Sequence, residues 1–292
     1  MVFALCLLDV QNRATDRRGS VVSTNICEND VRASVDRYTV NIANQKHAIE
    51  SIIDAASRAE SFEVFTLNLD HLVKLRSDPA FREAYGRARF VTADGRPVAA
   101  IAAREDKRIE LCTGSDMFVP LVQEAAKNDL PIYLFGTRKD VLLTAERRLM
   151  ELTNGRLKVV GSSAPPMGFD PQGGAADEAL EAIRASGARL CFVALGAPKQ
   201  ELFAARATEL GVPAGFVCIG ASIDFIAGQQ VRAPVIVRQA GFEWAWRLGS
   251  NPWRMANRYT KCAIMRAELA FPEHLSGKLL PYREAEHNLH KS

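Results

Sequence analysis

The chain has 292 residues, of which 48% are hydrophobic and 24% are charged, with a formal net charge of +3 at pH 7. This composition is typical of folded, water-soluble proteins and excludes disordered, collagen-like and coiled-coil chains. The length fits one large domain or two small ones.

Segment 1–35 is predicted to be an N-terminal extension. Residues 2–8 are apolar, but they follow no basic residues and precede no small-residue cleavage site, which argues against a secretory signal peptide. The rest of the segment is polar and irregular. No later stretch approaches the ~20 apolar residues that a membrane-spanning helix requires.

Segment 36–229 is predicted to be an α/β domain, because short β-branched or aromatic runs alternate with longer amphipathic ones from Tyr38 onward. Strands are expected at 62–66, 89–92, 131–135, 157–160, 190–195 and 215–219. Helices are expected at 45–59, 69–85, 96–104, 116–127, 139–152, 174–186 and 199–210. This alternation predicts right-handed βαβ units and a Rossmann-like, mostly parallel sheet with helices on both faces.

Segment 230–292 is predicted to be a basic helical appendage. All three tryptophans lie in it, at 244, 246 and 253. A mixture of tryptophans and basic residues suits a surface that lies on an anionic membrane, but a helical pair with a solvated basic face and packed indoles fits equally well. Nucleic acid is another polyanion that basic residues bind, although no recognised binding motif accompanies the charge. Between Gln230 and Ala267 one acidic residue stands against seven basic ones: Arg232, Arg238, Arg247, Arg254, Arg258, Lys261 and Arg266.

Six cysteines are spread through the chain without a CxxC pair or a Cys/His cluster at metal-ligand spacing. Neither a disulfide framework nor a zinc site is predicted. Cys191 and Cys218 lie in apolar runs and are interpreted as small buried hydrophobic residues. The pattern favours a reducing, cytoplasmic compartment.

Small and polar residues follow the predicted strands, in loops 66–68, 93–95, 136–138, 196–201 and 220–224. In open parallel sheets, ligands bind outside the carboxyl ends of the strands. Glycines in such loops allow a backbone to approach a ligand, and the N–H groups of the following helix favour phosphate. A glycine at such a turn is also ordinary turn chemistry.

Asp94 follows an apolar strand, where a carboxylate can act as a general base. An N-cap or an Asx turn before the helix that contains Val98 is the alternative. His71 is interpreted as a residue of the first helical turn rather than as a catalyst.

Several signature motifs are absent from the chain. It has no GxGxxG, GxxxxGK[ST], HExxH or GxSxG, which argues against dehydrogenases, P-loop NTPases, zincins and α/β-hydrolases. No two aspartates stand two positions apart, so an Asp-x-Asp site for a divalent cation is missing as well. A bound diphosphate would need helix N-termini or arginines instead of a metal.

An ordered set of motifs resembles the WecG/TagA/CpsF bacterial glycosyltransferases, also called glycosyltransferase family 26, over most of the chain. Each motif alone is weak, but their order is specific. The matching segments are Thr66-Leu-Asn68, Ala93-Asp-Gly95, Gly114-Ser-Asp116, Gly196-Ala-Pro-Lys-Gln-Glu201, Gly228-Gln-Gln-Val-Arg-Ala-Pro234, Gly241-Phe-Glu-Trp-Ala-Trp-Arg-Leu248, Pro252-Trp-Arg254 and Arg258.

The resemblance implies transfer of a sugar from a UDP donor to a polyprenyl-diphosphate-linked saccharide, with inversion and without a required metal. The implied sugar is N-acetylmannosamine-like or another hexose, and the implied products are teichoic acid, common antigen, capsule or exopolysaccharide. The implied location is the cytoplasmic face of the membrane, with an anionic membrane surface as a partner. The UDP-sugar is a substrate, so no cofactor and no nucleic acid are expected, and the oligomeric state is left open, a homo-oligomer included.

Residue roles follow from the same resemblance. Asp94 matches the proposed catalytic base, and Thr66 and Asn68 match a polar pair in the same pocket, in agreement with the need of an inverting displacement for a carboxylate base. Donor binding is assigned to strand-end residues, of which Gln200 and Glu201 match the family's donor motif: Gly136, Gly196, Pro198, Gln200, Glu201 and Asp224. Binding of the acceptor diphosphate is assigned to the matching arginines of the appendage: Arg232, Arg247, Arg254 and Arg258.

Two departures concern the donor sugar. Arg96 and Pro97 stand where family members often have glycines, which leaves the sugar open. The main alternative function is a nucleotide-sugar-binding protein of a polysaccharide assembly complex that performs no transfer. A second alternative is an enzyme that modifies nucleotide sugars in solution.

Overall fold

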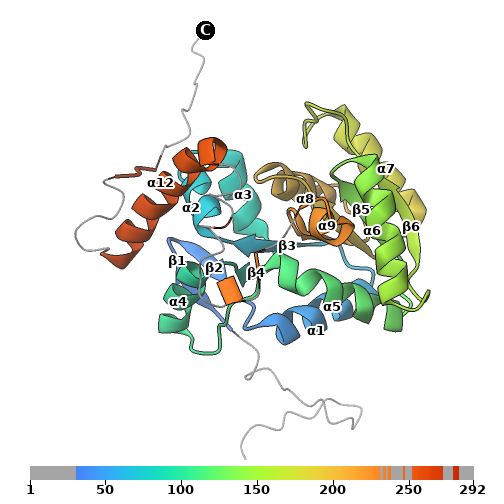
Figure 1. Ribbon diagram of the computed structural model, residues 1–292, viewed down its shortest axis with the longest axis horizontal. Helices are drawn as coiled ribbons and strands as arrows, with labels where there is room; N and C mark the ends of the chain where they lie inside the picture. Colours follow the sequence, from blue (N-terminus) through green and yellow to red (C-terminus); the bar gives the residue numbers. More distant parts are fainter. Residues whose placement is uncertain are drawn as a thin grey trace, which may run out of the picture. The chain divides into compact units, whose positions relative to one another are not determined.

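The structure is a computed structural model that describes residues 31–230, 233–234, 236–237, 246, 252–271 and 279–282 (Figure 1). Residues 1–30 of the predicted extension lie outside the described part. Within it, a sheet of six strands and the helices around it account for most of the chain.

The six strands are all parallel and follow the order β4-β3-β8-β7-β5-β6. Each overlaps one of the predicted runs, so the predicted Rossmann-like sheet is confirmed. All residues of β3, β5, β7 and β8 are buried, as expected for strands that are covered on both faces. The strands are β3 (Phe62–Leu67), β4 (Phe90–Ala93), β5 (Ile132–Gly136), β6 (Val159–Ser163), β7 (Leu190–Ala194) and β8 (Gly215–Cys218).

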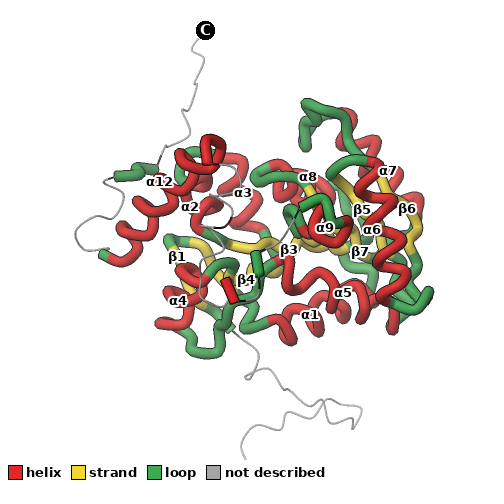
Figure 2. Tube along the Cα trace, viewed as in Figure 1, coloured by secondary structure: helices red, strands yellow, loops and turns green. Residues whose placement is uncertain are grey.

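Helices lie on both sides of the sheet (Figure 2). They form a separate apolar core with each face. Leu190 and Phe192 of β7 belong to one core, and the alternate residues Cys191 and Val193 belong to the other. The first core takes α1 (Gln45–Ser57), α5 (Gly114–Lys127), α6 (Lys139–Leu152) and α9 (Ser222–Ala227). The second takes α2 (Leu69–Leu75), α3 (Pro79–Arg87), α4 (Arg96–Glu105), α7 (Gly174–Ser186) and α8 (Lys199–Glu209).

The prediction of a single helix over 69–85 is wrong, because α2 and α3 are separate helices. Asp78 is the N-cap of α3, and its side chain accepts a hydrogen bond from the backbone N–H of Phe81 at 3.0 Å. Pro79 is the first residue of α3 and disfavours helical backbone at the residue before it. The short helix α9 was not predicted.

A two-stranded antiparallel hairpin precedes α1 and consists of β1 (Ala33–Val35) and β2 (Tyr38–Val40). It begins inside segment 1–35, for which the sequence indicates no regular structure. Ala33 and Val35 point into the apolar core while Ser34 between them is exposed. A strand of three residues is too short to show this alternation clearly in the sequence.

The C-terminal helix α12 (Pro252–Ala270) packs against α2 (Figure 1). Cys262, Met265 and Glu268 are buried and recur every three residues along one side of the helix. No helix in the described part of the chain is long and apolar enough to span a membrane.

Candidate active site

The predicted site residues that the structure describes, apart from the appendage arginines, follow strands of the sheet. Because all six strands are parallel, the loops that follow them lie at one edge of the sheet. Thr66 and Asn68 belong to β3 and its end, Asp94 follows β4, Gly136 ends β5, and Asp224 follows β8. Gly196, Pro198, Gln200 and Glu201 follow β7.

Asp94 and Asn68 are neighbours at the ends of adjacent strands. Leu67 is in register with Ala93, and the backbone N–H of Asp94 donates to the carbonyl oxygen of Leu67 at 2.8 Å. Asp94 and Asn68 are both half-buried, so each is accessible from the edge of the sheet. The N-cap of α4 is Gly95, so the alternative interpretation of Asp94 as an N-cap is wrong.

Asn68 also begins α2. Its Oδ1 accepts a hydrogen bond from the backbone N–H of His71 at 3.0 Å, which caps the helix. His71 therefore lies in the first turn of α2, as predicted. Thr66 is buried behind these residues, and a Cβ added to Gly114 would lie 3.5 Å from the Cγ2 atom of Thr66. The N-terminus of α5 thus packs against Thr66.

Gln200 connects the loops after β7 and β8. Its side chain is only 3% exposed. Oε1 accepts from the backbone N–H of Gly220 at 3.1 Å, and Nε2 donates to Oε1 of Glu201 at 2.7 Å. Gly196 and Gly220 have no atom within 4 Å of the place where a Cβ would lie, so both face open space. Pro198, which a cis peptide bond precedes, occupies the N-cap position of α8.

Glu201 is fully buried below Gln200, and burial raises the pKa of its carboxyl group to about 7. Its Oε2 has no hydrogen-bond partner among the described residues. Its Oε1 lies 3.8 Å from Nε2 of His71, whose Nδ1 is hydrogen-bonded to the hydroxyl of Tyr85 at 2.7 Å. Burial lowers the pKa of His71 to about 3, so its imidazole is neutral at physiological pH. The pair forms a buried polar cluster beneath the site.

The loops after β5 and β8 are joined by Thr137, whose hydroxyl donates to Oδ1 of Asp224 at 2.8 Å. Gly136 has a φ of +123°, and a Cβ there would lie 2.4 Å from the carbonyl oxygen of Ala194. Close packing of β5 against β7 is therefore sufficient reason for a glycine at 136. Donor binding by Gly136 and Asp224 remains a prediction.

Of the four arginines predicted to bind the acceptor diphosphate, the structure describes the side chain of Arg258. Its Nε lies 3.0 Å from Oδ1 of Asp70 in an ion pair, and the side chain is 41% exposed. Arg254 lies one turn earlier in α12, but its side chain is outside the described part. Arg232 and Arg247 also lie outside it.

A comparison with protein-family models shows which family the chain belongs to. The model of the "Glycosyl transferase WecG/TagA/CpsF family" matches residues 34–276. The chain belongs to this family. It is therefore a glycosyltransferase of a family that acts in cell-surface polysaccharide biosynthesis. The match runs from β1 to beyond α12 and so includes every strand-end loop described above.

Sequence reasoning missed a cluster on α2 of this WecG/TagA/CpsF protein. Nζ of Lys74 donates to Oδ2 of Asp70 at 2.7 Å and to the carbonyl oxygen of Ala197, in the loop after β7, at 2.9 Å. The signal was present in the sequence as an acidic and a basic residue four positions apart, directly after the Asn68 cap. The contact of Lys74 with Ala197 could not be predicted, because the two residues are far apart in the sequence.

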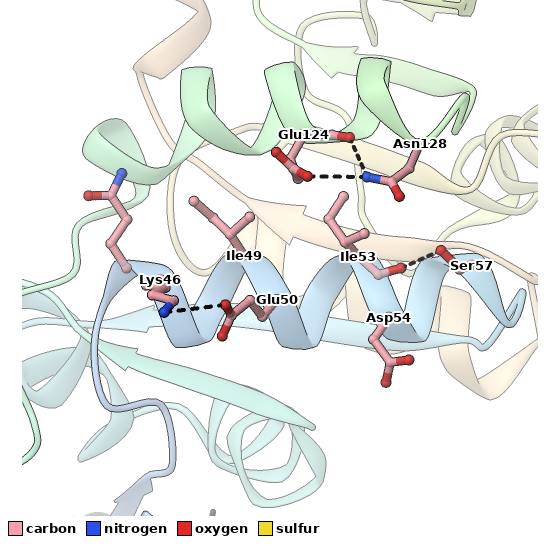
Figure 3. Close-up of a pocket in the computed structure, with 9 residues that line it drawn as sticks. Lys46, Ile49, Glu50, Ile53, Asp54, Ser57, Glu124 and Asn128 are labelled. Carbon is pink, nitrogen blue, oxygen red and sulfur yellow. Dashed lines mark hydrogen bonds and ion pairs between the residues drawn. The ribbon is translucent and has the colours of Figure 1, made fainter.

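An open groove of about 730 Å³ lies between the parallel helices α1 and α5 (Figure 3). Ile49 and Ile53 form its apolar floor, and Glu50, Asp54 and Glu124 contribute acidic groups. It contains none of the predicted site residues and lies in a helix layer instead of at the carboxyl edge of the sheet. The active site at the strand ends of this WecG/TagA/CpsF protein stays a prediction, and this groove is not part of it. In the described part of the chain, no three His, Cys, Asp or Glu side chains are grouped to hold a metal ion.

Proposed function

We propose that this glycosyltransferase moves a hexose, N-acetylmannosamine or a relative of it, from a UDP donor to a saccharide carried on a polyprenyl diphosphate. The observation that carries the proposal is the adjacency of Asp94 and Asn68 at one end of a row of strand-end loops. The loops of β8, β7 and β5 continue the row along the same edge. Neighbouring strands lie about 4.8 Å apart, so the row from β4 to β5 spans about 19 Å, enough for an extended nucleotide sugar.

Asp94 is the proposed general base. The acceptor hydroxyl oxygen attacks the anomeric carbon, and its proton passes to the Asp94 carboxylate. The bond between the anomeric carbon and the diphosphate oxygen breaks, and UDP departs with that electron pair. Attack opposite to UDP inverts the anomeric centre. Asn68 stands beside Asp94 and Thr66 lies buried behind them, and we assign to this pair the orientation of the reacting groups.

The leaving diphosphate needs positive partners as its charge develops. The chain has no Asp-x-Asp motif, and we assign this task to backbone N–H groups of the strand-end loops and to arginines of the appendage rather than to a divalent cation. Gln200 and Glu201 lie at the start of α8, where they support recognition of the nucleotide. No cofactor takes part, because UDP-sugar is a substrate.

A lipid-linked acceptor requires the enzyme to work at a membrane surface. Arg258, Lys261 and Arg266 of α12 are exposed, and basic groups of this kind bind anionic headgroups. The proposal therefore places the protein peripherally on the cytoplasmic face of the membrane.

The test is a transfer assay with a panel of UDP-sugars and a short-chain polyprenyl-diphosphate N-acetylglucosamine acceptor, with and without EDTA. We expect one donor to give a product of inverted configuration, and EDTA to leave the rate unchanged. Inhibition by EDTA would contradict metal independence, and a retained configuration would contradict single displacement.

Two further outcomes of the same assay favour the alternatives. UDP binding without transfer to any acceptor would favour a non-catalytic nucleotide-sugar-binding protein. Consumption of the donor in the absence of lipid would favour an enzyme that modifies nucleotide sugars in solution.

A further inference from the structure

One carboxylate on α2 connects the C-terminal helix with the loop after β7. Nε of Arg258 lies 3.0 Å from Oδ1 of Asp70 in an ion pair, and Oδ2 accepts a hydrogen bond from Nζ of Lys74 at 2.7 Å. The same Nζ donates to the carbonyl oxygen of Ala197 at 2.9 Å. The Asp70 side chain is 10% exposed, whereas those of Lys74 and Arg258 are 33% and 41% exposed. A nearly buried anion thus holds two cations that approach from different elements.

We propose that Asp70 is a positioning residue, which orients Arg258 toward the acceptor diphosphate and couples it through Lys74 to the loop after β7, which ends at Pro198 and leads into Gln200 of α8. The inference rests on the proposed function, since that function assigns Arg258 to the acceptor. An arginine bound through Nε keeps the two Nη groups for a second anion. A half-exposed guanidinium with one anchored edge suits a ligand that arrives from the membrane side.

The place of Asp70 in α2 supports this role. It lies two residues after Asn68, which stands beside the proposed base, so one short helix carries both contacts. A second ion pair joins the same two helices further along, between Arg76 and Glu268. In the described part of the chain the side chains of this pair form their further hydrogen bonds with Asp36, Leu279 and Leu280, none of which follows a strand of the six-stranded sheet, and so the pair offers a matched control for docking of α12 without coupling to the site.

The kinetic test uses Asp70→Asn, which keeps the shape of the side chain and removes its charge. We expect the KM for the lipid-linked acceptor to rise about tenfold, because an ion pair with a nearly buried carboxylate no longer orients Arg258. We expect kcat to stay nearly unchanged and Asp70→Glu to restore part of the loss. In an Arg258→Gln background, Asp70→Asn should add no further increase, because the two side chains act as a unit.

Two controls separate positioning from stability. Glu268→Gln weakens the other ion pair between α12 and α2 and should raise the acceptor KM less than Asp70→Asn does, because it leaves the contact of Asp70 with Arg258 in place. Asp129 follows α5 and forms an exposed ion pair with Lys158 at 2.8 Å. Asp129→Asn removes this pair and should leave kcat and the acceptor KM unchanged. An equal rise in KM in Glu268→Gln, no rise in Asp70→Asn, or additive effects of Asp70→Asn and Arg258→Gln would each overturn the proposal.

A second readout requires no activity. Hydrogen exchange of the amides at 196–202 should be faster in Asp70→Asn than in the wild type and in Asp129→Asn, because Lys74 loses the anchor that holds it on Ala197. Unchanged exchange would overturn the coupling to the loop. A wild type that transfers no sugar would contradict the proposed function, and the exchange result would still decide whether Asp70 holds the loop.

Discussion

At the scale of single residues, the buried pair of Glu201 and His71 has the most unusual electrostatics. Burial raises the pKa of Glu201 to about 7 and lowers that of His71 to about 3. Both shifts have the same physical cause, since a low-dielectric interior disfavours either charge. Glu201 also holds Nε2 of Gln200, so its protonation state bears on the orientation of a candidate donor-binding residue.

Glu201→Gln should remove one part of the pH dependence of stability. The folded protein keeps the Glu201 proton between its ordinary pKa of 4.5 and about 7, where the unfolded chain has lost it. The wild type therefore loses stability as the pH rises through this range. We expect similar unfolding free energies of the two proteins near pH 5 and an advantage of about 3 kcal/mol for the variant at pH 8. Urea unfolding at several pH values measures this difference, and parallel curves would contradict it; His71 is present in both proteins and cancels.

Gly136→Ala should destabilise the protein, because the left-handed backbone and the nearby carbonyl oxygen of Ala194 leave no room for a methyl group. The expected cost is about 3 kcal/mol in urea unfolding. Gly86→Ala is the control, since nothing lies within 4 Å of its Cβ position inside α3. That change should be neutral or stabilise by up to about 1 kcal/mol. Equal midpoints for the two variants would show that the close approach does not exist.

At the scale of elements, α2 joins three parts of the chain through its C-terminal end. Arg76 is 2% exposed and donates to both carboxylate oxygens of Asp36, at 2.9 and 3.0 Å, in the turn between β1 and β2. It also pairs with Glu268 of α12 and donates to the carbonyl oxygen of Leu280 at 2.6 Å. Oε1 of Glu268 accepts from two backbone N–H groups, those of Leu279 and Leu280. The chain after α12 is thus tied back onto the helix.

Arg76→Met should therefore loosen α12. Removing one member of a buried ion pair leaves the other charges uncompensated, so we expect a loss of about 3 kcal/mol in unfolding free energy. All three tryptophans lie between 244 and 253, so intrinsic fluorescence follows this part of the chain. In urea unfolding of the variant, the change in tryptophan fluorescence should occur at a lower urea concentration than the loss of circular dichroism. Arg58→Met, which removes an exposed ion pair with Glu60, is the control and should have no measurable effect. Equal losses of unfolding free energy in both variants would contradict the stabilising role of Arg76.

Elements with strong local patterns could be predicted from the sequence. β7 was found because an unbroken apolar run marks a strand with two covered faces. The prediction places β6 at 157–160, ahead of its observed position at Val159–Ser163, because Gly161 to Ser163 are small or polar residues at the edge of the sheet. The sequence also placed Asp94, Asn68 and Gln200 at one edge, since that requires only parallel strands. The contacts Asp70 with Arg258 and Arg76 with Glu268 join residues that are nearly 200 positions apart, and no local pattern reports them.

At the scale of the whole molecule, the basic appendage stands at the end of an otherwise near-neutral chain. We expect the full chain to bind vesicles that contain phosphatidylglycerol and to ignore vesicles of phosphatidylcholine alone. Binding should weaken as NaCl is added, because the attraction is screened. Lys261→Gln with Arg266→Gln should reduce binding, since both side chains are exposed on α12. Sedimentation with vesicles measures it, and equal binding to both lipids would contradict an electrostatic contact.

The most direct test of the account is the turnover of Asp94→Asn with the donor that the wild type uses. A general base contributes about 10²- to 10⁴-fold, so we expect kcat to fall by about 10³-fold. UDP binding, measured by calorimetry, should be unchanged, and Asp129→Asn should transfer sugar at the wild-type rate. A variant that binds UDP and transfers sugar as fast as the wild type would show that the carboxylate at the end of β4 is not the base.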